Sequence, residues 1–234
     1  MTSERKPPMD PVWGDCETEP QASGSWNEKR RVASVFRRLI QRLVAVDAPE
    51  GALAGVAERL EETLEAISPW PQRSALEGFA EGATSGNVHA MFDRSPMVGL
   101  SNPLSPPMRL RDENGVIRGT VSFGAAYEGP PGHVHGGFIA AAFDEVLGFA
   151  QSLTGHPGMT ASLNIKYLHP TPLHCELWVE AKVSRIDGRK ILAQGQLGRD
   201  QLTLAEASGL FVSVDADKIR KLVGKSAIKR EAPE

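Results

Sequence analysis

The chain has only two cysteines, Cys16 and Cys175, among its 234 residues. They show no CxxC spacing, and two cysteines form no disulfide framework, so we expect a reducing compartment. Residues 1–8 lack the apolar core of a secretion signal, and no stretch approaches the roughly 18 uninterrupted apolar residues that a membrane helix needs. These absences predict a cytoplasmic protein without a membrane span.

Neither sign of charge is in large excess, since 26 Lys and Arg residues stand against 29 Asp and Glu residues, for a net charge of −3. This balance provides no global attraction to nucleic acid or to an anionic membrane. We therefore expect no nucleic-acid partner, and any cationic binding patch must be local. Apolar residues make up 41% of the chain, which is enough for an ordinary globular core.

The hydrophobic pattern divides the chain into four parts. Residues 1–27 combine Pro, Ser, Gly and charge without an apolar period, and the tail at 216–234 is polar, so we expect both to be loosely held. Between them we predict a helical extension with irregular loops at 28–107 and a folded domain at 108–215. No internal repeat and no alternating βαβ pattern is present.

Apolar residues at helical spacing predict two helices in the extension, at 28–46 and at 51–67. A stretch rich in Gly, Pro and Ser follows at 68–107, with a short helix near 88–92. Such a long irregular stretch usually wraps a neighbouring domain or forms part of a site. The periodicity does not indicate which of these applies.

The folded domain shows two strands, one long apolar helix and then four strands. The predicted elements are strands 108–112 and 116–125, helix 136–153, and strands 160–168, 175–186, 189–197 and 202–214. Asn114-Gly115 is a strong hairpin signal, and Asp187-Gly188 supplies a second tight turn. Only the one helix is available to cover a face of the sheet, so we predict an α+β fold with an antiparallel sheet wrapped around a central helix, the hotdog architecture.

Two adjacent carboxylates, Asp144 and Glu145, lie in the middle of this otherwise apolar helix. Burying a charge is unfavourable unless it is paired, so carboxylates in such a setting are often functional. Asp144 shares its face of the helix with four small residues three, four or seven positions away, which predicts a groove that a substrate or a second helix can approach. These residues are Gly137, Ala140, Ala141 and Gly148. Glu145 has bulkier neighbours and is expected to reach the rim. The alternative is that both acids simply stand where the helix meets water.

The helix is preceded by a loop rich in Pro and Gly, at 129–137, which ends in His135-Gly136-Gly137. The first turn of a helix has unpaired N–H groups and a positive dipole end, which suit a developing oxyanion.

His133 and His135 also suggest a metal pair. Such a site needs a glutamate shortly after the second histidine, but Ile139 and Ala140 stand four and five residues after His135, so neither a metal nor a cofactor is expected. No GxSxG motif indicates a serine nucleophile.

The strand at 160–168 alternates between polar and apolar residues. The expected polar face consists of Thr160, Ser162, Asn164 and Lys166. The opposite face consists of Ala161, Leu163, Ile165 and Tyr167. The polar face is either the wall of a site or ordinary surface, and the alternation does not distinguish the two.

The run from Tyr127 to Asp144, with its Pro-Pro-Gly and His-Gly-Gly segments, and the run from Met159 to Tyr167 resemble the acyl-CoA thioesterase branch of the hotdog superfamily. They are similar to the phenylacetate-pathway (PaaI-type) enzymes and to the mammalian thioesterases that carry the same Pro-Pro-Gly loop. The resemblance covers about 108–214. Its specific elements are the His-Gly-Gly segment, an aspartate nine positions after its histidine and a threonine sixteen positions beyond the aspartate.

The resemblance implies hydrolysis of a fatty or aromatic acyl-CoA to the free acid and coenzyme A. It implies that the amides of His135, Gly136 and Gly137 polarise the thioester carbonyl. Asp144 would then act as general base or as nucleophile, and Thr160 would place water or substrate. The residues implied to contact coenzyme A are Asn164, Lys166, Arg189 and Lys190.

Two positions depart from the pattern of the family. Gly129 stands six residues before His135, where PaaI-type enzymes often have Asn, and Leu168 stands where relatives offer a further cation. A non-catalytic acyl-CoA sensor with the same pocket is the alternative function. The presence of Asp144 and Thr160 together favours an enzyme.

The sequence also predicts a homodimer with shared active sites, and pairing of dimers into tetramers is left open. Gly136 and Asp144 are eight residues apart, which is about 12 Å along a helix axis at about 1.5 Å per residue. A general base must lie within about 3 Å, or one water, of its target. An antiparallel second helix from another subunit would bring its Asp144 beside Gly136, and related hotdog enzymes are built in this way.

Overall fold

The structure is a computed structural model that describes residues 25–71, 92–156 and 158–213. Two helices come first, α1 (Ser25–Ala45) and α2 (Glu50–Ile67). The folded domain follows. It contains β1 (Arg109–Glu113), β2 (Val116–Ser122), η1 (Ala125–Tyr127), α5 (Gly136–Ser152), β3 (Gly158–Tyr167), β4 (Glu176–Asp187), β5 (Lys190–Arg199) and β6 (Leu202–Ser213). The predicted short helix near 88–92 lies almost entirely outside the described residues, as do the two predicted terminal segments.

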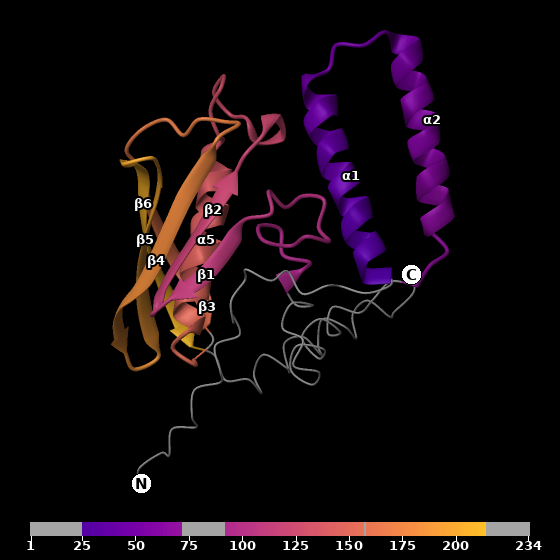
Figure 1. The fold of residues 1–234 in the computed structure, drawn as a ribbon. Coiled ribbons are helices and arrows are strands. Elements are labelled where there is room, and N and C mark those ends of the chain that lie inside the picture. The colour runs from indigo at the N-terminus through magenta and orange to yellow at the C-terminus, as the bar shows by residue number, and fades with distance from the viewer. Residues whose placement is uncertain (1–24, 72–91, 157, 214–234) are drawn as a thin grey trace.

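The six strands form one antiparallel sheet in the order β1-β2-β4-β5-β6-β3. Figure 1 shows this sheet curving around α5, which lies along its concave side. The predicted α+β hotdog fold is therefore confirmed. The strand order places β3 at an edge of the sheet, beside α5.

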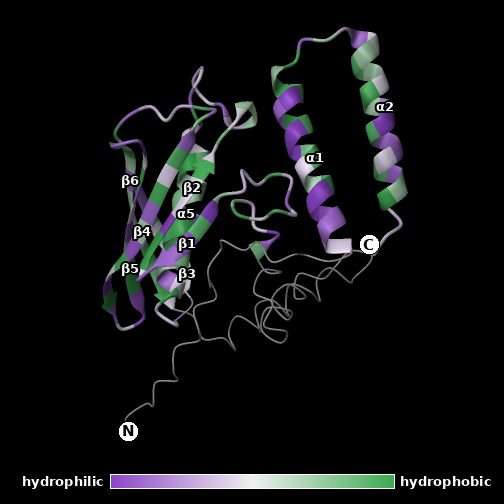
Figure 2. Cartoon of the chain, viewed as in Figure 1, coloured by the Kyte–Doolittle hydropathy of each residue, from purple (hydrophilic) through white to green (hydrophobic). Residues whose placement is uncertain are grey.

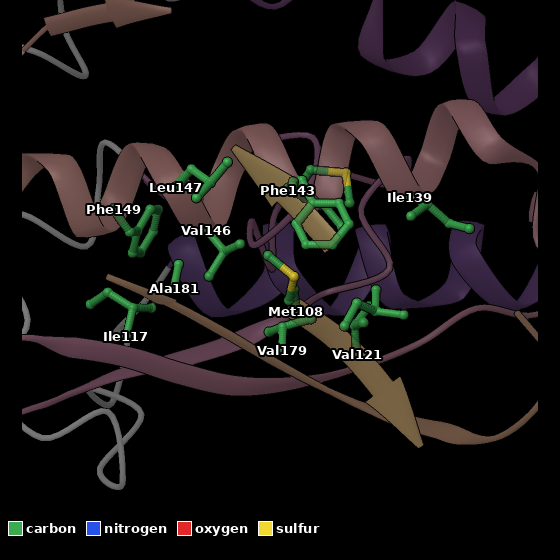
Figure 3. Close-up of a cluster of buried hydrophobic side chains, with 14 of the residues drawn as sticks. Met108, Ile117, Val121, Ile139, Phe143, Val146, Leu147, Phe149, Val179 and Ala181 are labelled. Atoms are coloured by element: carbon green, nitrogen blue, oxygen red, sulfur yellow. The ribbon is translucent and has the colours of Figure 1, made fainter. Parts of the chain in front are cut away.

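The core lies between α5 and the sheet, where large apolar side chains from both layers meet (Figure 3). Phe143, Val146 and Leu147 of α5 are almost fully buried against Ile117 and Val179 of the sheet. Each such side chain contributes about 1.5–3 kcal/mol by leaving water. Apolar burial therefore fixes the axial position of α5, and with it every polar side chain that the helix carries.

The hairpin signals are also confirmed. Asn114 and Gly115, between β1 and β2, both have positive φ angles, 56° and 84°. A two-residue turn with this geometry matches the right-handed twist of the flanking strands, and Asn-Gly adopts it easily. Gly188, between β4 and β5, has a φ of 55° and serves the second hairpin.

Polar side chains along one side of helix α1 attach it to the folded domain. Arg30 forms an ion pair of 3.0 Å with Asp93, and Arg37 donates from Nη1 to two backbone carbonyls in the loop before β1. Gln41 accepts a hydrogen bond of 3.0 Å from the N–H of Ala126 in η1. Much of the apolar surface of both helices is exposed, and Figure 2 shows hydrophobic and hydrophilic residues mixed along them. Among the described helices, none is both long and apolar enough to cross a membrane.

Candidate active site

The start of α5 is held by a chain of backbone hydrogen bonds. His135 precedes the helix, and its Nδ1 accepts a hydrogen bond of 3.0 Å from the N–H of Gly137. The N–H of His135 donates to the carbonyl of Tyr127, and the N–H of Phe138 donates to the carbonyl of His135. Within the described ranges, the N–H of Gly136 has no acceptor. It is therefore the open amide at the positive end of the helix dipole, while a ligand at the Gly137 amide must first displace His135.

Tyr167, at the end of β3, covers the other side of this helix start. Its hydroxyl donates to the carbonyl of Gly136 at 3.0 Å. A Cβ on Gly136 would lie 3.4 Å from the Tyr167 ring, in van der Waals contact, so the ring lies directly against this glycine. Tyr167 therefore sets the position of the glycine that carries the open amide. The alternation placed Tyr167 correctly on the apolar face of the strand, but no pattern in the sequence assigned it this contact.

Asp144 lies two turns further along α5 and meets Thr160 of β3. The hydroxyl of Thr160 donates to Oδ1 of Asp144 at 2.8 Å, and both side chains are exposed in the single chain. Oδ2 of this carboxylate has no partner among the residues that the structure describes. The hydroxyl of Thr160 therefore orients the carboxylate, whose second oxygen is open to a water or a carbonyl.

A β-bulge brings Thr160 to this position. Thr160 pairs with Phe211 and Ser162 pairs with Leu210, so Ala161 is the extra residue on β3. The extra residue shifts Thr160 to the sheet face of Phe211, which is buried on the α5 side. The predicted polar face, which grouped Thr160 with the polar residues further along the strand, is therefore wrong at this position.

Glu145 is the more buried of the two acids, so the expectation that it reaches the rim is wrong. The loop before β1 packs over this side of α5, where the rings of Phe92 and Phe149 lie 5.2 Å apart. Within that loop the hydroxyl of Ser95 donates to Oε1 of Glu145 at 2.6 Å. Burial raises the pKa of Glu145, the hydrogen bond from Ser95 opposes this, and the nearby charge of Asp144 raises it further. Ser95 was not identified in the sequence, because nothing local links it to a residue fifty positions away.

The first two predicted coenzyme-binding residues lie on the other side of the sheet. Asn164 and Lys166 of β3 line a polar hollow of about 410 Å³ on the face that points away from α5. The hollow also contains Glu180, Gln194 and Gln196 from neighbouring strands. It is therefore separated from the Asp144–Thr160 pair by the thickness of the sheet.

Arg189 and Lys190 lie together at the β4–β5 turn. Arg189 donates from Nε and Nη2 to the last described carbonyl of β6, and Lys190 pairs with Val212 of the same strand. Lys166 pairs with Glu206, six residues earlier on β6, which is about 20 Å away at 3.3 Å per residue. One chain therefore brings Arg189 and Lys190 together but does not bring Lys166 to them.

The two histidines before α5 are occupied by local hydrogen bonds. Nδ1 of His133 lies 2.9 Å from the carbonyl of Pro131, and Nδ1 of His135 caps Gly137. Among the described residues no group of three or more His, Cys, Asp or Glu side chains gathers in the manner of a metal site. The structure therefore offers no metal ligand set around the helix start.

An antiparallel sheet around a central helix, with a glycine-rich helix start and an Asp–Thr pair beside it, defines an α+β protein of the hotdog type. The profile of the family described as the thioesterase superfamily matches residues 131–205. The crystal structure of a thioesterase superfamily protein superimposes with a TM-score of 0.70 and 34% sequence identity, over 84% of this chain and 94% of that one. The chain belongs to the thioesterase superfamily.

Curated relatives are similar to part of the chain. Acyl-coenzyme A thioesterase THEM4 of Xenopus laevis is 37% identical over 93 residues, which is 39% of this chain and 42% of that protein. The THEM4 protein of Mus musculus is 38% identical over 110 residues, 45% of this chain and 47% of that protein. Acyl-coenzyme A thioesterase THEM5 of Homo sapiens is 32% identical over 97 residues, 41% of this chain and 39% of that protein. The chain thus spans less than half the length of the curated relatives it matches.

Proposed function

We propose that this protein is an acyl-CoA thioesterase of the PaaI-like kind, which hydrolyses a fatty or aromatic acyl-CoA to the free acid and coenzyme A. The observation that carries the proposal is the exposed carboxylate of Asp144, oriented by Thr160 on the helix whose first turn has an open amide. The thioesterase superfamily relationship and the acyl-coenzyme A thioesterases among the relatives support it. We expect a cytoplasmic location on the sequence grounds given above.

In the proposed reaction Asp144 takes a proton from water while the water oxygen attacks the thioester carbonyl carbon. The carbonyl oxygen gains negative charge and is stabilised by the N–H of Gly136 at the helix dipole. When the tetrahedral intermediate collapses, the carbon–sulfur bond breaks. The coenzyme A thiolate leaves and takes up a proton, and the acyl group departs as the free acid. In the second route the Asp144 carboxylate attacks the same carbon directly, the carbon–sulfur bond breaks and the coenzyme A thiolate leaves. Water then cleaves the resulting anhydride to the free acid and the regenerated carboxylate of Asp144.

We expect each active site to be shared between two subunits. In one chain Asp144 and Gly136 are about 12 Å apart along α5, too far for a base and an oxyanion donor that act on one carbonyl. Strand β3 lies at the sheet edge beside them, and its apolar side chains Met159 and Tyr167 are 58% and 53% exposed. Such an edge readily pairs with another strand. A second copy with its α5 antiparallel to the first would bring the partner's carboxylate to the open amide.

Free-thiol release from a panel of acyl-CoAs tests the activity, with the variant Asp144→Asn measured beside the wild type. Thiol release that depends on Asp144 supports the hydrolase. If acyl-CoAs bind but no thiol appears from any of them, the protein is a non-catalytic acyl-CoA sensor.

Complementation tests the shared site. Asp144→Asn and Gly137→Val should each be folded and inactive, because the valine Cβ would stand 3.1 Å from Nδ1 of His135 and disturb the helix start. When the two variants are mixed and subunits exchange, mixed dimers should regain one competent site in two. If subunit exchange is demonstrated by mass labelling and no activity returns, the shared-site arrangement is wrong.

A further inference from the structure

A second hollow lies between α1 and the segment that leads into the Pro-Pro-Gly loop, on the side of η1 away from the start of α5 (Figure 1 shows α1 beside this part of the domain). Its volume is about 540 Å³, within the range of about 300–1,000 Å³ that is usual for small-molecule sites. Its residues come from α1, the loop before β1, the end of β2, η1 and the turn before β4. Neither the thioester chemistry nor the coenzyme contacts proposed above use any of these side chains.

The charges that line this hollow are all positive. They belong to Arg37, Arg38 and Arg42, and no Asp or Glu is among the lining residues. Arg38 and Arg42 are exposed and have no ion pair within the described part of the chain. Asp93 interacts electrostatically with Arg37, but it is already paired with Arg30. Within the described part of the chain, Arg38 and Arg42 are therefore uncompensated cations at the rim of the hollow, and Arg37 is compensated only in part by Asp93.

Arg37 is the fixed member of this rim. Its Nη1 donates at 2.9 and 3.0 Å to the carbonyls of Leu100 and Asn102, which hold the guanidinium at the wall of the hollow. Burial lowers its pKa, and the interactions with Tyr127 and Asp93 oppose this without fully compensating. A half-buried guanidinium in this position favours an anionic ligand.

The remaining wall is mostly apolar and includes one polar group without a partner. Pro106, Pro107 and the ring of Tyr127 provide an apolar surface. The hydroxyl of Ser105, a fully buried lining residue, has no hydrogen-bond partner in the described structure. This hydroxyl is itself inaccessible from the hollow, so the surface that a ligand would meet here is the apolar one.

The wall is also firmly positioned. The side chain of Gln41 accepts from the N–H of Ala126, and a Cβ at Gly124 would collide with that same side-chain amide. The hydroxyl of Tyr127 donates to the carbonyl of Leu104 at 2.8 Å. These contacts lock α1 and η1 together, so the hollow is a preformed feature of the fold.

We infer that this hollow is a second binding site, for a molecule with an apolar body and one carboxylate. The arginine rim takes the carboxylate, and the proline and tyrosine wall takes the apolar body. The choice of a carboxylic acid rests on the proposed function, because its product is such an acid; the cationic, partly apolar site itself does not depend on it.

A ligand in this site contacts the element that holds the start of α5. The carbonyl of Tyr127 accepts the N–H of His135, and the rings of Tyr127 and Phe138 meet edge to face at 4.8 Å. An acid in the hollow is therefore in contact with an element that is hydrogen-bonded to the residue before the open amide of Gly136. The free acid binds at this site as a regulator of the reaction, and its inhibition is non-competitive with acyl-CoA.

Titration calorimetry with decanoate on the full chain tests the site. The variant is Arg38→Gln with Arg42→Gln, and the matched control is Arg31→Gln with Arg59→Gln, which removes the same charge from exposed positions away from the hollow. Decanoate should bind the wild type and the control alike and bind the variant at least tenfold more weakly. Decanol should bind all three proteins weakly and equally, because it lacks the charge.

Three outcomes would overturn the inference. The first is that decanoate does not bind the wild type, and the second is that the variant and the control bind it with equal affinity. The third is that inorganic phosphate binds as tightly as decanoate, which would leave the apolar wall without a role. In the activity assay, decanoate should lower kcat of the wild type and the control but not of the variant. Loss of turnover in all the proteins would count against the proposed hydrolase and would leave the calorimetric result unaffected.

Discussion

Asp144→Asn separates the chemical role of Asp144 from its structural role. In the wild type the hydroxyl of Thr160 lies 2.8 Å from Oδ1 of Asp144, and the aspartate side chain is exposed. Oδ1 of an asparagine at this position can still accept that hydrogen bond. We therefore expect the free energy of unfolding to change by less than about 1 kcal/mol. The affinity for acyl-CoA should also be retained, because no positive charge and no apolar wall is altered.

The expected loss lies in the chemical step. An amide cannot accept the proton from water, and the loss of a general base usually lowers the rate by about 10²–10⁴. At about 1.36 kcal/mol per tenfold change this corresponds to about 2.7–5.4 kcal/mol of transition-state stabilisation. The measurement is single-turnover thiol release with enzyme in excess over acyl-CoA, which reports chemistry without product release.

Glu145→Gln is the matched control, since it makes the same chemical change one residue further along α5. Its side chain faces Ser95 in the loop before β1, away from the Thr160 pair, so the rate should stay within a few-fold of the wild type. If Glu145→Gln abolishes turnover while Asp144→Asn does not, the assignment of the catalytic acid is wrong. If neither has an effect, the helix carries no catalytic carboxylate.

Three further predictions concern neighbouring groups. Arg189→Gln with Lys190→Gln should raise KM for acyl-CoA severalfold but hardly affect a short thioester without the nucleotide; equal losses on both substrates would indicate a folding defect. Burial raises the pKa of Glu145 above its ordinary value of 4.5, so the folded state binds the proton more tightly than the unfolded state does. The wild type therefore loses stability as the pH rises from about 4.5 through the raised pKa of the folded state. The Tm of Glu145→Gln should therefore equal that of the wild type near pH 4 and exceed it near pH 8, and a constant difference would contradict this. Tyr167→Phe removes the hydrogen bond to Gly136 and should lower kcat severalfold with little change in Tm, whereas an unchanged kcat would deny the tyrosine a positioning role.

The fold was largely predictable because its signals are local. Helical spacing of apolar residues identifies α1, α2 and α5 within a few residues of their observed ends, and Asn114-Gly115 identifies the first hairpin. An antiparallel sheet around the helix then follows from the strand count and from the need to cover one apolar face with the only helix available. The signals for the individual helices and hairpins use residues within about twenty positions of one another, whereas the strand order, in which β2 pairs with β4 and β3 with β6, was not predicted.

The site was predicted less completely because its geometry depends on pairing and packing between distant segments. The bulge at Ala161 moves Thr160 to the α5 side of the sheet, and simple alternation cannot reveal an extra residue on one strand. The partners Ser95 for Glu145 and Tyr167 for Gly136 join residues 50 and 31 positions apart. No local pattern encodes either contact.

The contrasting environments of the two acids follow from the position of α1. Asp93 is paired with Arg30 of α1 and with Ser101, and it is only 4% exposed, so this ion pair fixes the loop before β1 at one point. Two residues later Ser95 bonds Glu145, so the attachment of α1 extends through the loop to the middle of α5. The same loop leaves the Asp144 side of the helix uncovered. The N-terminal extension therefore helps to hold one carboxylate inside the fold while its neighbour, beside Thr160 and the free edge of β3, stays open to substrate.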